Sequence, residues 1–324
     1  MRRGSLEFWP HRRAKKIMPR VRTWPYSEEP KFLGLVAFKA GMTHIGMMDD
    51  SEAPSKGSEI ITSATVLEVP RIFVYGIRLY KKRGDNEYKE TSNEFYSKDL
   101  AISLGIKKTE NVVEKLSDIK SDLSKFVDVS ALMYLDASPL GFGNKRKLRF
   151  EVGVGGKDIQ SKIEFAEKWL GKEVKLFDVF ADGDYIDTIS VSKGKGWAGV
   201  IKRFGVARQV RKATGKVRHV GTLGPWHPPK VTYMVPMSGH MGFNYRTEIN
   251  KRVLRVSKAD DVKSVNVKGG FPNYGIVKSD FLIVKGSVAG PSKRLIRLRK
   301  AIRPTAPAKK PELTYISIES KQGA

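Results

Sequence analysis

The chain has 324 residues, enough for one large domain or two smaller ones, and its 60 Lys and Arg against 34 Asp and Glu give a net charge of +26 at pH 7. This excess exceeds what solubility requires and predicts a nucleic-acid partner rather than a merely basic surface or an anionic membrane, because no basic amphipathic helix or lipidation signal is present. The absence of cysteine excludes disulfides, thiol catalysis and Cys-ligated zinc, and no apolar run approaches the roughly 18 residues of a membrane span, so we expect a soluble, intracellular protein.

Residues 1–31 are predicted to form an extended basic arm. Four prolines distributed along it prevent a continuous helix. Aromatic residues spaced among the arginines favour an arm that stacks and pairs on RNA over a disordered solubilising tail. The candidate RNA-binding residues of the arm are Arg2, Arg3, Arg12, Arg13, Lys15, Lys16, Arg20, Arg22 and Trp24.

Residues 32–84 are predicted to be the first part of a small barrel or sandwich, because short apolar runs rich in strand formers follow one another between turn residues. The expected elements are strands at 32–38, from His44 to Asp49, at 60–69 and at 72–80, with a loop at 39–43 and a break at Pro70.

Residues 85–173 are predicted to be an α/β lobe inserted between barrel strands. Residues 85–184 carry 19 Asp and Glu against 16 Lys and Arg, a net charge of −3, while the rest of the chain has a net charge of +29. The lobe is therefore expected to have an ordinary protein surface, whereas the rest of the chain is a polycation. Apolar spacings of four and three predict an amphipathic helix through Val112, Leu116, Ile119, Leu123 and Phe126.

A second helix is predicted near the end of this lobe. Ser161 with Glu164 three residues later matches a capping box, and Gly171 matches the stop of the same helix. Ala166 and Trp169 are expected to face the core.

Barrel strands are predicted to resume at 174–192. The Asp182-Gly183 pair is a hairpin turn signal, and residues 185–191 are the expected return strand. Closing strands within 248–303 are expected at 254–257, 264–267, 281–285 and 295–298, followed by a loose Pro- and Lys-rich tail at 304–324.

The stretch from Thr188 to Thr247 contains eleven Lys and Arg and no Asp or Glu. Because it cannot neutralise its own charge, it must take counter-charge from a partner, and polyphosphate is the obvious supplier. Lys193–Gly199 combines lysines with glycines that let backbone amides approach phosphate closely, and 200–211 is expected to be partly helical. We therefore predict a basic RNA-penetrating loop at 193–247.

Trp226 stands in a rigid turn, Gly224–Pro229, near the middle of this loop. An isolated Trp framed by prolines usually packs in its own core, but a segment this hydrophilic offers none nearby, so we favour a tip that packs or stacks on RNA bases. Fixing the backbone costs about 1–2 kcal/mol per residue. The loop has few large aliphatic side chains, and their burial cannot offset this cost. The loop is therefore expected to be mobile until it binds RNA.

Enzymatic alternatives find little support in the sequence. The five histidines have no HExxH pattern or paired metal-ligand spacing, and no G-x-S-x-G elbow occurs. Residues 153–157 partly match a phosphate loop, but Glu151 and Asp158 stand where Gly and Ser or Thr are required. Asp182, Asp184 and Asp187 are better explained by a hairpin than by a metal cluster. An RNA-modifying enzyme or assembly factor acting on rRNA remains the alternative, and a general chromosome-binding protein comes third.

Independent blocks of the sequence fall in the same order as in a known family. They are Arg3–Leu6, Arg20–Pro25, Gly34–His44, Lys193–Gly205, Gly221–Pro228, Tyr245–Arg252, Gly270–Gly275 and Val284–Gly286. Together they span nearly the whole chain and resemble the universal large-subunit ribosomal protein L-three family in its archaeal and eukaryotic branch.

The resemblance implies a mixed, mainly β fold: a six-stranded translation-protein-type β-barrel with an α/β insertion, a long basic internal loop and an extended basic N-terminal arm. It implies direct binding of large-subunit rRNA near its 3′ end, early in subunit assembly, with the loop reaching toward the peptidyl transferase centre and Trp226 at its tip. The implied partners are this rRNA and neighbouring ribosomal proteins in the cytoplasm. No catalytic residue, cofactor, metal, small-molecule substrate or membrane is implied.

Beyond the arm, we assign rRNA binding to basic and aromatic residues of the loop and its flanks. They are Lys39, Lys193, Lys195, Trp197, Lys202, Arg203, Arg208, Arg211, Lys212, Lys216, Arg218, Trp226, His227, Arg246, Lys251 and Arg252. Two departures from the family concern modification. His240 replaces the Gln that bacterial members methylate, and Thr214 stands where eukaryotic members carry a methylated His, so neither methylation is carried over to this chain.

Overall fold

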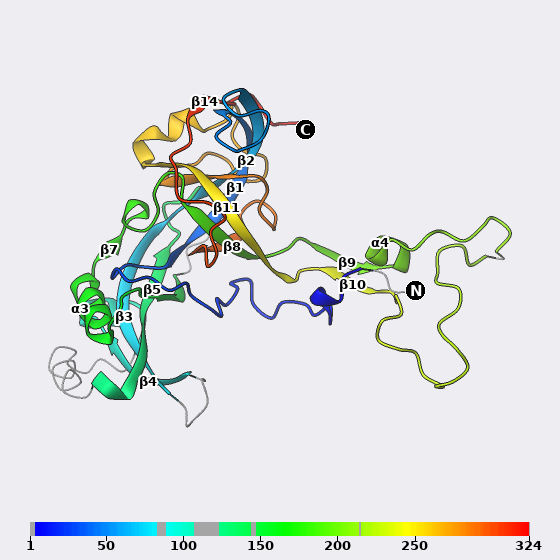
Figure 1. Ribbon diagram of the computed structural model, residues 1–324, viewed down its shortest axis with the longest axis horizontal. Coiled ribbons are helices and arrows are strands. Elements are labelled where there is room, and N and C mark those ends of the chain that lie inside the picture. Colours follow the sequence, from blue (N-terminus) through cyan, green and yellow to red (C-terminus); the bar gives the residue numbers. More distant parts are fainter. Residues whose placement is uncertain (1–3, 83–88, 107–122, 144–146, 214, 324) are drawn as a thin grey trace. The chain divides into compact units, whose positions relative to one another are not determined.

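The computed structural model describes residues 4–82, 89–106, 123–143, 147–213 and 215–323 and is mainly β (Figure 1). It divides into two compact units. We call Met1–Ile17 with Val191–Arg246 the loop unit, and Met18–Ser190 with Thr247–Ala324 the sheet unit. The predicted arm at 1–31 is therefore divided, because its first half belongs to one unit and its second half to the other.

The first sheet of the sheet unit has seven strands in the order β13-β8-β11-β12-β2-β1-β14, and β13 also pairs with β1. Its strands are β1 (Gly34–Met48), β2 (Glu59–Glu68), β8 (Tyr185–Val191), β11 (Tyr245–Ser257), β12 (Phe281–Lys285), β13 (Leu295–Lys300) and β14 (Leu313–Ile316). Their apolar residues fill the main core, in which the largest fully buried side chains include Phe32, Phe180, Phe271 and Phe281.

The second sheet has the order β4-β3-β5-β6, with β7 paired to β3. Its strands are β3 (Arg71–Lys82), β4 (Lys89–Tyr96), β5 (Phe126–Asp136), β6 (Leu148–Gly153) and β7 (Glu173–Val174). Helix α3 (Ile159–Trp169) packs on β5 and β3 through its buried Ile163 and Ala166. The remaining helices described in this unit are α1 (Lys98–Ser103) and the 3-10 helices η2 (Leu123–Lys125), η3 (Leu176–Asp178) and η4 (Ala259–Ser264).

The loop unit has little regular structure. It contains η1 (Leu6–Phe8), β9 (Gly194–Ala198), α4 (Val200–Phe204) and β10 (Gly239–Gly242). Strands β9 and β10 pair antiparallel, and α4 ends at Gly205, whose φ of 65° is the left-handed conformation that glycine adopts without strain. The helix predicted within 200–211 is therefore confirmed as one short helix at its start.

Several predicted elements agree with the structure. Strands β2, β3, β8, β12 and β13 lie where strong β-formers predicted them, and Gly183 in the turn before β8 has a φ of 88°. Helix α3 buries Ala166 and packs Trp169 against the core, as expected. These segments were predictable because their local pattern and their tertiary environment favour the same conformation.

The loop predicted at 39–43 is wrong, because β1 runs without interruption from Gly34 to Met48. A bulge between Lys39 and Gly41 absorbs the irregularity while pairing with β2 continues on both sides. A Cβ at residue 41 would lie 2.4 Å from the Phe271 ring, so Gly41 marks a close approach within the strand rather than a turn.

The second sheet begins earlier in the chain than the predicted boundary at residue 85. Strand β3 pairs with β4 and β5 along its length, so Arg71–Lys82 belongs to the second sheet and the chain changes sheets at Pro70. A proline suits this position because it cannot donate to a strand ladder.

Four other predictions differ from the structure. Helix α3 begins at Ile159 with Asp158 as its N-cap, so Ser161 lies inside the helix and the predicted capping box is wrong. Ser264 is the last residue of η4, so the strand predicted at 264–267 is wrong, and the tail predicted to be loose contributes β14, which pairs with β1. In the helix predicted through Phe126, residues 107–122 lie outside the described residues, and Phe126 itself begins β5.

Candidate nucleic-acid interface

The loop unit contains a single carboxylate, Glu7, so its cations have almost no acidic partner within the unit. Most of the cationic side chains that are predicted to meet phosphate in this unit are exposed, which leaves their charge facing solvent or a partner. These exposed residues are Arg12, Arg13, Lys15, Lys16, Lys193, Lys195, Lys202, Arg208, Arg211, Lys212, Lys216 and Arg218. Such an arrangement attracts a polyanion strongly and in a salt-dependent way.

Strand β9 presents Lys195 and Trp197 at the base of this unit, directly after Lys193. The first four residues of the strand are all exposed, and the Trp197 side chain keeps 78 % of its surface accessible. Pairing with β10 fixes the backbone by placing His240 opposite Trp197. Lys195 and Trp197 therefore lie on a short strand that pairs with β10, and Lys193 directly precedes it.

Four aromatic rings bring the arm and the internal loop together within this unit. Trp9 stacks on Phe204 at a centroid distance of 5.6 Å, and His11 stacks on the same ring at 5.4 Å. Tyr233 meets the Trp9 ring edge-on at 6.0 Å. Nearby, the backbone N–H of Ala14 donates to the Phe243 carbonyl at 2.8 Å, so residues 4–17 pack as part of the loop unit.

Arg203 belongs to this cluster rather than to the exposed set. Its guanidinium lies 4.9 Å from the Phe204 ring, Nε donates to the His240 carbonyl at 3.0 Å, and Nη1 donates to the Met237 carbonyl at 2.7 Å. Burial lowers the pKa of Arg203. Burial, followed by the nearby charges of Arg203 and Arg246, also lowers the pKa of His11, so the stacked imidazole is favoured in its neutral form.

Arg246 is likewise engaged inside the unit. Its guanidinium lies 4.6 Å from the Phe8 ring, and Nη1 donates to the Tyr245 carbonyl at 2.9 Å. Arg203 and Arg246 therefore help to hold the loop unit together. The sequence pattern could not distinguish this role from phosphate binding, because it reports only the charge of each residue.

Trp226 does not pack in a core of its own unit. Its side chain is 87 % exposed, and every residue from Gly221 to Lys230, including His227, is exposed. An indole exposed to this degree presents its flat apolar face to solvent or to a partner.

Four residues predicted to bind rRNA are instead occupied within the sheet unit. Lys39 is 8 % exposed, and its ammonium donates to the Val288 carbonyl at 2.5 Å and the Gly290 carbonyl at 3.3 Å. Arg252 forms a two-pronged pair with Asp50, with N–O distances of 2.6 and 2.5 Å. These interactions hold the two charged groups inside the fold, so Lys39 and Arg252 are removed from the candidate interface.

Trp24 and Lys251 also differ from expectation. Trp24 packs against the main core, where its ring lies 5.8 Å from the Arg297 guanidinium and a Cβ at Gly153 would be 2.6 Å from it. Lys251 pairs with Glu248 at 2.9 Å. Of the remaining arm residues, Arg20 and Arg22 are exposed on the sheet unit, and Arg2 and Arg3 lie outside the described residues.

Comparison with known proteins decides the family. The family model described as Ribosomal protein L3 matches residues 1–323. The chain belongs to the ribosomal protein L3 family. It is 42 % identical to the large ribosomal subunit protein uL3 of Methanobrevibacter smithii over 99 % of this chain and 98 % of that protein. It is 41 % identical to the uL3 of Methanocaldococcus jannaschii over 99 % and 97 % of the two chains.

Membership of this family makes the chain a ribosomal protein and not an enzyme, so the RNA-modifying alternative is set aside. In the described ranges, no group of three His, Asp or Glu is placed to hold a metal ion. None of the helices described is long and apolar enough to cross a membrane.

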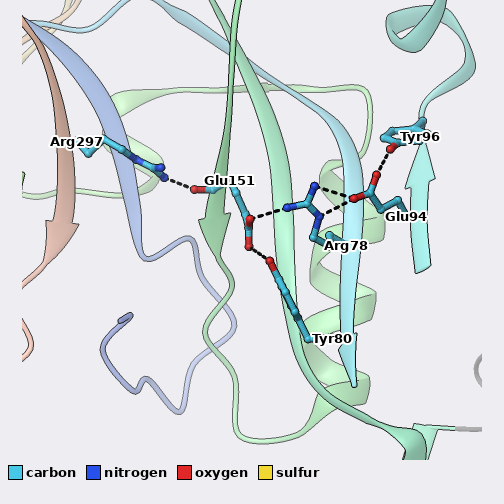
Figure 2. Close-up of polar contacts among 6 residues, drawn as sticks. All are labelled: Arg78, Tyr80, Glu94, Tyr96, Glu151 and Arg297. Atoms are coloured by element: carbon cyan, nitrogen blue, oxygen red, sulfur yellow. Dashed lines mark hydrogen bonds and ion pairs between the residues drawn. The ribbon is translucent and has the colours of Figure 1, made fainter. Parts of the chain in front are cut away.

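The second sheet carries a network of polar side chains that the sequence analysis did not predict. Figure 2 shows Arg78 between the carboxylates of Glu94 and Glu151, at 2.7 and 2.8 Å. The Tyr80 hydroxyl donates to Glu151 and the Tyr96 hydroxyl to Glu94, while Arg297 donates to the backbone carbonyl of Glu151. Burial, together with the Glu151 hydrogen bond, raises the pKa of Tyr80 to about 12.

The charged groups of this network are paired with one another. Each cation faces a carboxylate or a carbonyl, and each carboxylate faces a donor, so little net charge is left for a polyanion. The alternation of side chains along a strand places Arg78 and Tyr80, which are two residues apart, on the same face of β3. It could not have predicted their partners, Glu94 on β4 and Glu151 on β6.

Proposed function

We propose that this chain is a structural protein of the large ribosomal subunit that binds large-subunit rRNA directly through its loop unit. The observation that carries the proposal is the contrast within that unit between its row of exposed cations and its single carboxylate, Glu7. A folded unit with this charge is stabilised when phosphates replace its counter-ions. The uL3 relatives from methanogenic archaea bear the name of the large ribosomal subunit, which supports the same assignment.

Two kinds of interaction with rRNA are proposed. The exposed lysines and arginines at 193–218, with Arg12, Arg13, Lys15 and Lys16, neutralise phosphates and position the protein without reading sequence. Trp197 and Trp226, at 78 % and 87 % exposure, stack on or pack beside bases, and His227 lies next to the tip. Arg203 and Arg246 are proposed to shape the unit rather than to bind directly.

The finer placement follows the family. We propose that the protein joins the rRNA near its 3′ end early in assembly, that residues 193–247 reach toward the peptidyl transferase centre with Trp226 at the tip, and that neighbouring ribosomal proteins contact the near-neutral lobe. The assembled subunit would then place the protein in the cytoplasm. The length of the exposed basic segment and the position of Trp226 near its middle support this placement.

We also infer a six-stranded translation-protein-type barrel formed by β1, β2, β12, β11, β8 and β13. The pairing of β13 with both β8 and β1 supports closure of these six strands, with β14 added outside on β1. Closure removes free sheet edges, which suits a scaffold that must hold a long basic loop. In this scheme the α/β insertion, predicted at 85–173, begins with β3.

Binding is expected to order the loop unit. Within 191–246 the buried side chains are few and small, such as Val191, Ala198 and Val200. Ordering the backbone costs about 1–2 kcal/mol of conformational entropy per residue, and the burial of these side chains offsets little of that cost. Hydrogen exchange should therefore be fast for 193–247 in the free protein and slow in the subunit. Strong protection of this segment without RNA would contradict the proposal.

The primary test is sedimentation of cell extract, first at moderate and then at high salt, with detection of this chain. Co-migration with large subunits that survives high salt is expected of an integral component, because a shaped interface holds the protein even after added salt has weakened its many interactions with phosphate. Release at moderate salt would contradict a structural role and would support a transient assembly factor.

A further inference from the structure

The sheet unit contains a pocket of about 860 Å³, which lies outside the basic surface proposed to bind rRNA. Five segments meet there: the turn after β1, the start of β8, the middle of β11, the end of β12 and the C-terminal segment around Pro307. The volume lies in the range of ligand pockets in proteins. Because all five segments belong to one compact unit, the pocket is part of a single folded body.

Two polar groups on β11 lack partners at this pocket. Asn250 has a φ of 54°, in the left-handed region, and its Nδ2 donates to Thr305 Oγ1 at 2.9 Å while its Oδ1 is buried without a hydrogen bond. Arg252 is 9 % exposed and binds Asp50 through its terminal nitrogens, but its Nε has no partner. A buried polar group without a partner costs free energy, and strained residues of this kind gather at binding sites.

The pocket carries charges of both signs. Arg252 neutralises Asp50 and Lys251 pairs with Glu248, so the other charged lining residues are Asp49, Glu52, Lys285 and Lys309. Hydrogen bonds from Ser55 and Ser51 lower the pKa of Asp49 to about 2, so this carboxylate stays ionised. The two carboxylates repel phosphate whereas the two lysines attract it, so this pocket favours RNA less than the exposed cations of the loop unit, which have a single carboxylate among them.

An apolar wall completes the pocket. Ile249 lies on β11 with 58 % of its side chain exposed, and Tyr185 and Pro307 line the same space. A protruding aliphatic side chain beside polar groups of both signs matches the anatomy of a protein–protein interface, in which an apolar centre is surrounded by a polar rim.

We propose that this pocket receives an extended peptide segment of another protein of the large subunit. The segment places an apolar side chain on Ile249 and a Lys side chain on the carboxylate of Glu52. The inference rests on the proposed function, because it takes the partner from the same subunit, and it assigns this surface to protein rather than to RNA.

Zero-length carbodiimide cross-linking of intact large subunits tests the interaction. The expected product joins the Glu52 carboxylate to a lysine of one neighbouring protein and is identified by mass spectrometry. Glu52→Gln should abolish that product, whereas Glu319→Gln, a change at an exposed carboxylate elsewhere in the same unit, should leave it unchanged. Absence of any protein cross-link from Glu52 in subunits that contain this chain would overturn the proposal.

A matched pair of substitutions tests the apolar anchor. Ile249→Asp should lower the occupancy of the cross-linked protein in salt-washed subunits by roughly tenfold, as expected when an apolar side chain is removed from the centre of an interface. Ile61→Asp, at an isoleucine 76 % exposed on β2, should not change it. Unchanged protein occupancy, with new chemical reactivity of rRNA nucleotides in Ile249→Asp subunits, would assign the pocket to RNA and reject the proposal. Absence of the unsubstituted chain from large subunits would instead refute the proposed function.

Discussion

The sheet unit binds several of its strand arginines inside the fold, whereas the loop unit leaves most of its cations exposed. In the sheet unit, Arg299 Nη2 lies 2.6 Å from the fully buried Asp187 carboxylate, and Arg252 holds Asp50. In the loop unit, Lys193 and Lys195 are exposed at β9 and Glu7 is the only acid. Basic residues therefore stabilise the fold in the sheet unit and provide affinity for a partner in the loop unit. The two roles differ because the sheet unit contains buried carboxylates that pair with arginine and the loop unit does not.

The largest effect is expected from removing a buried carboxylate of the sheet unit. Asp187→Ala leaves Arg299 unpaired in the interior and removes the acceptor of the Asn250 N–H. Breaking a buried pair from one side typically costs about 3–5 kcal/mol, so chemical denaturation should show a loss of that order. Asp260→Ala, at an exposed carboxylate of the same unit, should change stability by at most about 0.5 kcal/mol.

Two tryptophans offer a direct test of the comparison. Trp24→Ala removes a ring packed between Gly153 and Arg297 and should destabilise the free protein by about 2–4 kcal/mol, since large-to-small changes in cores cost up to about 5 kcal/mol. Trp226→Ala removes a ring that is 87 % exposed and should change stability by at most about 0.5 kcal/mol, while impairing subunit function. A loss of several kcal/mol for Trp226→Ala in thermal melts would show that it is a core residue.

Neutralising the lysines at β9 should affect RNA binding and not folding. The double variant Lys193→Gln and Lys195→Gln should lower the slope of log affinity against log salt concentration by roughly one unit for each phosphate that is no longer neutralised. Filter binding to an rRNA fragment over a salt series measures this slope. Lys268→Gln and Lys278→Gln, at exposed positions of the sheet unit, serve as the control and should leave the slope unchanged.

The smallest effect concerns acid stability. The pKa of Asp49 is about 2, below the ordinary value of 3.8 for an aspartate, because Ser55 and Ser51 donate hydrogen bonds to the ionised carboxylate. A depressed folded-state pKa stabilises the fold above the unfolded pKa and loses that contribution as pH falls through the folded one, so Asp49 matters between about pH 4 and pH 2. Asp49→Asn should flatten the decline of sheet-unit stability across that window, as followed by denaturant unfolding at a series of pH values.

Hydrogen exchange of individual segments at the same pH values extends this test to the loop unit. Glu7 is the only carboxylate of that unit, so its exchange should not acquire a new pH dependence below about pH 4. Acid-induced opening confined to the loop unit would contradict the comparison between the two regions.

Sequence patterns predicted well those elements whose signal is local. Strands β8 and β12 were predicted because β-formers occur between clear breakers, and the exposed cations of 193–218 were predicted because charge in a segment without acids has no partner within that segment. The continuous course of β1 through Gly41 was not predictable, because the bulge there lies against Phe271, a residue far along the chain.

The amino-acid sequence by itself determined the family, the mainly β composition, the uneven distribution of charge and the basic segment with Trp226 near its middle. Only the tertiary structure decided which cations remain available. Lys39 and Arg252 are bound by carbonyls and a carboxylate from distant segments, Trp24 enters the core, and Arg203 packs on Phe204. The physical reason is that pairing and burial depend on neighbours brought together by folding, whereas the charge of a segment is fixed by its own residues.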